Sequence, residues 1–433
     1  MNVSPTSPSA PLVAFGPAAA VAGHRSSAPS VLFFTTLVQA LASMAALMVP
    51  VLGPRIADDL QLPGAVLGYY VALVYLAAVP SSVLGGDAVL RYGPVRVSQA
   101  SLVLCAVGLA MVSSGLWWLA SCGALLIGLG YGPVTPASSH MLALAAPASS
   151  RGLVFSIKQT GVPLGGAIAG FLAPRMAVSS GWQAALLVGG AACLLCAVAS
   201  QGWRRANDED RIASHPMGLC VFVEMARLLR QSVALRTLAT AAFLFAMFQL
   251  SLGTYLVTFL HQGFAYSLVQ AGFMMSMAQG AGIVGRLVWG IVADRLLRGP
   301  KLLLVLGAVM TLGCLAMAAL PRDWPAGALL GVVVLVSACA LGWNGFFLAE
   351  VTRQSPPGVT GRATGAILAC MFAGVVVGPP IFGSLASATG SYSLAFAVIA
   401  IAPLAATLVL LVRRRALAPS LVSPSSTASS QPL

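Results

Sequence analysis

Residues 285–295 read Gly-Arg-Leu-Val-Trp-Gly-Ile-Val-Ala-Asp-Arg and close an apolar run with a Gly-x3-Asp-Arg pattern at Gly290, Asp294 and Arg295. An altered copy occurs earlier, where residues 86–93 read Gly-Asp-Ala-Val-Leu-Arg-Tyr-Gly. The first glycines of the two copies are 204 positions apart, close to half of the 433-residue chain. A membrane chain with the same loop signature in each half is typical of two related bundles, which enclose one solute site that faces each side in turn.

The composition identifies lipid as the solvent for most of this chain. Apolar residues make up 58% of it and charged residues 8%, whereas a soluble domain carries roughly 25% charged residues. One membrane-spanning helix needs about 20 apolar residues. The sequence therefore predicts an all-α integral membrane protein with twelve transmembrane helices. The expected spans are 31–50, 65–85, 95–115, 117–140, 152–174, 182–203, 235–260, 268–292, 301–320, 326–349, 362–387 and 391–412.

The distribution of basic residues predicts topology and argues against a nucleic-acid partner. The net charge is +13, but 18 of the 23 Lys and Arg residues fall in the tails and the even-numbered loops. The odd-numbered loops contain Arg55, Arg175 and Arg322. Basic residues gather on the cytoplasmic side of membrane proteins, so both termini are expected in the cytoplasm, with the protein in the cell inner membrane.

The predicted spans divide into two six-helix bundles. Residues 31–203 form the N-terminal bundle and residues 235–412 the C-terminal bundle. Between them, residues 204–234 are expected to form a cytoplasmic loop with an amphipathic helix on the membrane surface. The Ser- and Pro-rich tails, 1–30 and 413–433, are expected to be disordered. The cysteines lie mostly in or near spans and suggest neither a disulfide framework nor a metal site.

The loop signature, the six-plus-six plan and the long central loop make residues 31–412 resemble the major facilitator superfamily. The resemblance implies two bundles that rock about a shared central cavity, and a motif after spans two and eight that locks one orientation. The residues of this chain that match the motif, and so carry the conformational lock, are Gly290, Asp294, Arg295, Gly86, Arg91 and Gly93. In the first copy Leu90 replaces the acidic residue, and Asp87 lies three residues before it.

An acidic residue at a helix end has a readable physical role. A carboxylate there can cap the positive N-terminus of another helix, worth about 0.3–2 kcal/mol, or pair with an arginine. Such a contact exists in one orientation of the bundles and biases the equilibrium toward it. By the two-fold relation, Asp294 is expected to meet the start of span five, near Arg151 and Gly152.

Two cations within the spans are the strongest candidates for a binding site, since intramembrane charges are costly and usually functional. Lys158 lies about 9 Å into span five, and Arg286 lies about 12 Å before Asp294, at 1.5 Å per helical residue. If both face the cavity, they can bind a carboxylate or another anion. The alternative is that each reaches the membrane surface or pairs with Asp294 or Glu350.

Neutral polar residues of the spans complete the predicted site. In the resembling family, spans one, four, seven and ten line the cavity. With the two cations, the predicted substrate-binding residues are Lys158, Gln39, Gln159, Arg286, Gln249, Tyr255 and Asn344. For each neutral residue taken alone, a role in helix packing remains the alternative.

The sequence thus predicts a secondary active transporter of a small organic solute, an organic anion, that works by rocker-switch alternating access. No carboxylate lies clearly at mid-membrane, so a coupling proton would need His140, Glu350 or the substrate itself. One alternative is a proton-driven exporter of drugs or metabolites, although the arginine of the drug-antiporter branch is absent from span four. Another is a membrane solute sensor.

The remaining expectations concern partners and chemistry. No nucleotide-binding Gly-x4-Gly-Lys-Ser/Thr loop occurs and no catalytic cluster converges, so neither an enzyme nor a cofactor is expected. The partners expected are the small-molecule substrate, a possible coupling proton and the lipid bilayer, with no nucleic acid, and the protein is expected to be a monomer.

Overall fold

The computed structural model describes residues 27–147, 151–209, 211–215, 220–297, 299–321, 324–355 and 360–417. The first half contains α1 (Ala28–Leu60), α2 (Ala65–Tyr92), α3 (Pro94–Ser113), α4 (Trp117–Tyr131), α5 (Val134–Ala145), α6 (Arg151–Gln159), α7 (Gly161–Ser180), α8 (Trp182–Ala199), the short turn η1 (Ser200–Trp203) and α9 (Arg204–Asn207). The second half contains α10 (Cys220–Gln231), α11 (Val233–Thr258), η2 (Phe259–Gly263), α12 (Leu268–Arg295), α13 (Gly299–Ala319), α14 (Ala326–Gly342), α15 (Asn344–Gln354), α16 (Thr360–Thr389), α17 (Tyr392–Ile399), α18 (Ile401–Val412) and η3 (Arg414–Leu417).

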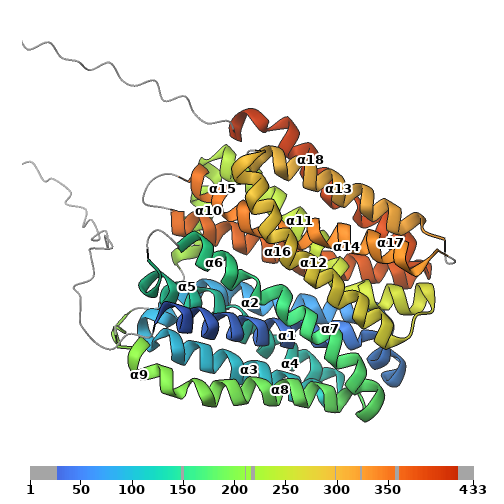
Figure 1. Cartoon of the computed structure of the whole chain (residues 1–433), viewed down its shortest axis with the longest axis horizontal. Coiled ribbons are helices and arrows are strands. Elements are labelled where there is room, and N and C mark those ends of the chain that lie inside the picture. The colour runs from blue at the N-terminus through green and yellow to red at the C-terminus, as the bar shows by residue number, and fades with distance from the viewer. Residues whose placement is uncertain are drawn as a thin grey trace, which may run out of the picture.

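The helices pack as two bundles that lie one above the other in Figure 1, with α1–α8 below and α11–α18 above. In the first bundle α1 packs on α7, and α3 packs on α4 and α8. In the second, α11 packs on α16 and α18, and α12 packs on α14. The bundles meet where α2 contacts α16, α7 contacts α12, and α1 contacts α11. The predicted all-α architecture is confirmed.

Eleven helical segments of the described residues are long and apolar enough to cross a membrane. The remaining predicted span is the eighth, 268–292, which corresponds to α12. Its 28 residues are long enough, but buried Ser276, Gln279 and Arg286 lower its hydropathy. These polar residues are tolerated because α12 packs between α7 and α14, so they face protein.

Four predicted spans are broken helices, and one of them is span twelve, which divides between α17 and α18 at Ala400. Span four bends between α4 and α5 at Gly132 and Pro133, and span five between α6 and α7 at Thr160. Span ten breaks between α14 and α15 at Trp343. Each break frees backbone carbonyl groups that a continuous helix would have used, and such groups are tolerated in a membrane only when buried in protein or facing a cavity.

Several predicted boundaries need correction. Span one is longer than 31–50, because α1 continues through Pro50 and Pro54 to Leu60. The first tail ends earlier than residue 30, since α1 begins at Ala28 with a proline in its first turn, where the missing N–H costs nothing. The second tail begins later than residue 413, because η3 is held where Gln354 donates a hydrogen bond to the carbonyl of Leu417 at 3.0 Å. Residues 1–26 and 418–433 lie outside the described part of the chain.

The predicted amphipathic helix of the central segment is α10, which packs against α11 and α16. Because the helices alternate in direction, the molecule has two ends. We call the end where α1 meets α2, at residues 61–64, the odd end, and the end where α2 meets α3, at Gly93, the even end. The even end carries most of the basic loops and is the one predicted to face the cytoplasm.

Candidate functional site

Lys158 lies at the end of α6, beside the break in span five, with 1% of its surface exposed. Its Nζ donates a hydrogen bond of 2.9 Å to Oε1 of Gln39 on α1. The same oxygen accepts a bond of 3.3 Å from the hydroxyl of Thr135 on α5. Within the described residues, no carboxylate pairs with this ammonium group. A buried cation whose hydrogen-bonding partner is a neutral oxygen is poorly compensated.

Arg286 of α12 joins the two bundles at the same depth. Its Nε donates to the carbonyl of Leu341, near the end of α14, at 3.1 Å, and its Nη1 donates to the carbonyl of Gln159, at the end of α6. Both acceptors are at helix C-termini, whose carbonyls carry partial negative charge. Arg286 is 9% exposed, and its acceptor Gln159 directly follows Lys158 in the chain. Two buried positive charges therefore meet where the bundles touch.

The second bundle repeats the polar arrangement of the first. Gln249 of α11 stands 210 residues after Gln39, and its Oε1 also accepts two hydrogen bonds. The donors are Nε1 of Trp343 at 3.0 Å and Nδ2 of Asn344 at 3.3 Å, both at the break in span ten. Asn344 also lies 3.4 Å from the carbonyl of Leu341, which Arg286 shares. One network thus runs from Gln249 to Arg286 and on to the neighbour of Lys158.

Six of the seven predicted ligands meet in this network, which we call the central network: Lys158, Gln39, Gln159, Arg286, Asn344 and Gln249. Gln159 takes part through its backbone carbonyl rather than its side chain. The alternative that the cations pair with Asp294 or Glu350 is wrong for the described residues. Glu350 instead accepts hydrogen bonds from Arg353 at 2.9 and 2.7 Å.

Tyr255 does not belong to the central network. Its hydroxyl donates to the carbonyl of Gly64 at 3.3 Å, and its ring stacks on Phe382 at 4.8 Å between centroids. Gly64 belongs to the first bundle, so Tyr255 holds the bundles together at the odd end. The reason is its depth: it lies six residues, about 9 Å, beyond Gln249 along α11.

Further contacts close the odd end. The backbone N–H of Ala65 donates to Oγ of Ser387 at 2.9 Å, and the hydroxyls of Tyr69 and Ser384 lie 3.0 Å apart. Between α7 and α12, a Cβ added to Gly170 would lie 2.8 Å from the carbonyl oxygen of Gly272. Small residues allow helix backbones to approach this closely. In this state the bundles are joined firmly at the odd end.

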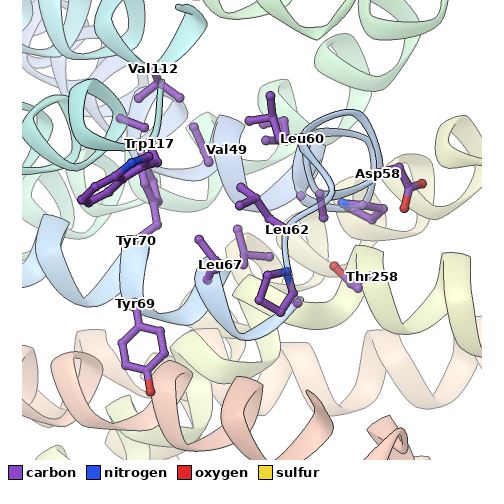
Figure 2. A pocket seen from close by; sticks show the side chains of 18 of the residues that line it. Val49, Asp58, Leu60, Leu62, Leu67, Tyr69, Tyr70, Val112, Trp117 and Thr258 are labelled. Carbon is purple, nitrogen blue, oxygen red and sulfur yellow. The ribbon is translucent and has the colours of Figure 1, made fainter. Parts of the chain in front are cut away.

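A cavity of about 220 Å³ lies at the odd end, away from the central network. Figure 2 shows Leu60, Leu62, Leu67, Tyr70 and Trp117 around it. The lining is mostly apolar, and Asp58 is its charged residue, so an anion would find no cation there. None of the six residues of the central network lines this cavity. The uncompensated cations, rather than the volume of a void, therefore locate the candidate anion site.

Gly93 is the motif residue whose role is clearest. It ends α2 with a φ of +93°, a conformation that favours glycine. A Cβ at this position would lie 2.4 Å from Cγ of Asp208, which accepts hydrogen bonds from the backbone N–H groups of Val95 and Arg96 at 2.8 and 3.3 Å. Burial raises the pKa of Asp208, and these hydrogen bonds oppose the rise. Gly93 thus makes room for an acidic cap on α3.

The other predicted lock residues lie at the even end. Arg91 stands over the ring of Tyr92 at 5.4 Å, and a Cβ added to Gly86 or Gly290 would meet nothing within 4 Å. Asp294 and Arg295 are exposed, and neither belongs to an ion pair among the described residues. The expected contact of Asp294 with the start of span five involves the side chain of Arg151, which lies outside what the structure describes. Asp87 lies 3.2 Å from Nε2 of His215 in the central segment.

Backbone groups and two side chains of the central network were not among the predicted ligands. The carbonyls of Leu341 and Gln159 serve as acceptors because the helices break beside them. Two residue pairs in the sequence indicate helix breaks. Gly-Pro at residues 132–133 marks the break of span four in the first bundle, and Gly-Trp at residues 342–343 marks the break of span ten in the second. Thr135, two residues after the first pair, donates to Gln39, and Trp343, within the second pair, donates to Gln249.

Known proteins are similar to this chain in both sequence and fold. The profile of the Major Facilitator Superfamily matches residues 32–372. An uncharacterized MFS-type transporter of Mycobacterium tuberculosis is 28% identical over 313 residues, covering 72% of this chain and 67% of its own. A probable sulfoacetate transporter of Cupriavidus necator is 24% identical, with 81% and 85% covered. The crystal structure of the nucleoside transporter NupG matches with a TM-score of 0.74 at 16% identity, covering 88% of this chain and 99% of its own.

Twelve spans in two bundles, broken helices around a buried polar network and a family profile over most of the chain all agree. Family and relatives consist of transporters rather than enzymes, and they bind small-molecule substrates within a lipid bilayer. The chain is a multi-pass membrane transporter of the Major Facilitator Superfamily.

Proposed function

We propose that this protein is a secondary carrier of a small organic anion, which binds Lys158 between the two bundles. The observation that carries the proposal is the burial of Lys158 against a neutral amide oxygen, with no described carboxylate beside it. A buried charge without a counter-ion is unfavourable by several kcal/mol. A substrate that brings the counter-ion gains much of that energy on binding.

The surroundings of Lys158 favour an organic acid over an inorganic ion. Gln39, Thr135, Asn344 and Gln249 offer amide and hydroxyl groups within the same network as the cations. Such groups can bind hydroxyl or carbonyl oxygens on the body of a substrate. One relative is named a probable sulfoacetate transporter, and sulfoacetate is a small organic anion.

Transport would follow if the two bundles alternated between closing at the odd end and closing at the even end. The contacts of Ala65, Tyr69 and Tyr255 join the bundles at the odd end, while Asp294 at the even end is exposed. In the opposite state the odd end opens and Asp294 caps a helix of the first bundle. With the even end in the cytoplasm, as the basic loops predict, the closed odd end faces outward. An anion bound between the bundles lowers the repulsion between Lys158 and Arg286, which opposes closure of the bundles around the site.

Uptake into proteoliposomes tests this function. The probes are labelled sulfoacetate, succinate and glucuronate, with the cation tetraphenylphosphonium and glucose for comparison. The proposal expects uptake of at least one anion, and loss of that uptake in Lys158→Gln. The matched control is Lys301→Gln, since Lys301 is the other lysine of the chain and is exposed. Uptake of the cation alone would favour a drug exporter, and binding without any uptake would favour a sensor.

A further inference from the structure

The central network contains a second cation, and Lys158 does not account for it. Arg286 belongs to the other bundle, lies about 2.5 turns of helix before the end of α12 at Arg295, and is 9% exposed. Its two hydrogen-bond acceptors are backbone carbonyls, at the ends of α14 and α6. These groups carry fractions of a charge and leave the guanidinium formally uncompensated.

Charge balance therefore concerns both residues together. Lys158 and Arg286 bring two positive charges, one from each bundle, to the end of α6, with no acidic partner among the described residues. A monoanion would neutralise one and leave the other buried. A ligand with two negative groups would neutralise both charges, one in each bundle, at the same time.

Unused hydrogen-bond donors point the same way. An arginine has five N–H donors, and two of those of Arg286 are engaged. A lysine has three, and one of those of Lys158 is engaged. Three donors on one side and two on the other match two oxyanion groups, each of which accepts more than one bond.

We propose that Arg286 makes this carrier selective for dianions, such as dicarboxylates and sulfocarboxylates, over monoanions of the same size. One anionic group binds Lys158 of the first bundle and the other binds Arg286 of the second. This inference rests on the proposed function and narrows its substrate class. A bridging ligand also links the bundles directly, so it favours the state in which both close around it.

Matched ligand pairs test the inference in the purified full-length protein. Butyrate and succinate have equal carbon counts and differ in one carboxylate, as do glucuronate and glucarate. Binding is measured by titration calorimetry in wild type, Arg286→Gln, Arg286→Lys and the exposed control Arg205→Gln on α9. We expect each wild-type dianion to bind about tenfold or more tightly than its monoanion, because a second close charge pair is gained.

The variants then separate charge from structure. Arg286→Gln should bind both members of a pair alike, whereas Arg286→Lys and Arg205→Gln should keep the preference. If Arg286→Gln does not fold, the result for Arg286→Lys tests the inference instead. If Arg286→Lys binds the dianion and the monoanion of a pair equally tightly, the inference is contradicted. Equal binding of both members by wild type overturns the dianion inference and leaves the proposed function intact. Failure of all four acids to bind overturns both.

Discussion

Arg286 of the second bundle donates a hydrogen bond to the backbone carbonyl of Gln159 in the first, directly beside Lys158. The contact exists because α6 ends at Gln159 and leaves that carbonyl without a helical partner. A helix break thus provides one of the points where the two bundles touch. The following predictions start from the two cations and extend to both ends of the molecule.

Replacing Gln39 by glutamate should supply Lys158 with an internal counter-ion. The Lys158 Nζ already lies 2.9 Å from Oε1 of Gln39, so the new carboxylate would pair with it without rearrangement. We expect Gln39→Glu to raise the melting temperature of the unliganded protein and to weaken anion binding at least tenfold, because a buried pair is worth about 3–5 kcal/mol over an unpaired charge.

The control for this change is Gln99→Glu. Gln99 bonds to the carbonyl of Ala197 and to Gln201 within the first bundle, far from either cation. The Gln99→Glu change adds the same charge as Gln39→Glu. It should leave the affinity for the anion unchanged, and that affinity should still depend on Lys158. Anion binding that survives in Gln39→Glu would show that Lys158 is not the residue that holds the substrate.

The motif glycines should differ in their tolerance of alanine. Gly93→Ala must accept a positive φ and displace the Asp208 cap, so we expect a loss of about 2–4 kcal/mol from strain and cap together. Gly86→Ala meets nothing within 4 Å inside α2 and should be neutral or slightly stabilising. Melting temperatures in detergent measure both. Equal destabilisation by the two changes would show that the cap on α3 is not what Gly93 protects.

A disulfide across the odd end should arrest the carrier. Ala65 and Ser387 come from different bundles and are joined by a hydrogen bond of 2.9 Å. In a background without the native cysteines, Ala65→Cys with Ser387→Cys should crosslink under oxidation and stop uptake, and reduction should restore it. Each single cysteine serves as a control. Undiminished uptake by the fully crosslinked protein would mean that the odd end need not open.

The same crosslink reports the lock predicted for Asp294. If Asp294 stabilises the opposite state, Asp294→Asn should favour the state described here and raise the crosslinking rate. A cap contributes about 0.3–2 kcal/mol, so the population ratio should change roughly two- to thirtyfold. Glu209→Gln removes an equally exposed acidic charge and should leave the rate unchanged. A rate unaffected by Asp294→Asn would remove it from the lock.

The sequence predicted the architecture well because hydropathy and the repeated motif are properties of the whole chain. Lys158 and Arg286 could also be recognised, since a charge in an apolar run is conspicuous in any span. Tyr255 is polar like the residues of the central network, but residue type does not give depth: at about 9 Å beyond Gln249, Tyr255 reaches the odd end. The backbone acceptors at Leu341 and Gln159 could not be foreseen, because they depend on where helices break and which bundle comes near.

Anion-dependent stabilisation measured on three proteins tests the central claim most directly. Wild type, Lys158→Gln and Lys301→Gln are melted with sulfoacetate, succinate, glucuronate, glucose and tetraphenylphosphonium. At least one anion should raise the melting temperature of wild type and of Lys301→Gln, and none should raise that of Lys158→Gln. If an anion stabilises Lys158→Gln as much as wild type, or if tetraphenylphosphonium alone stabilises wild type, the buried lysine does not bind the substrate.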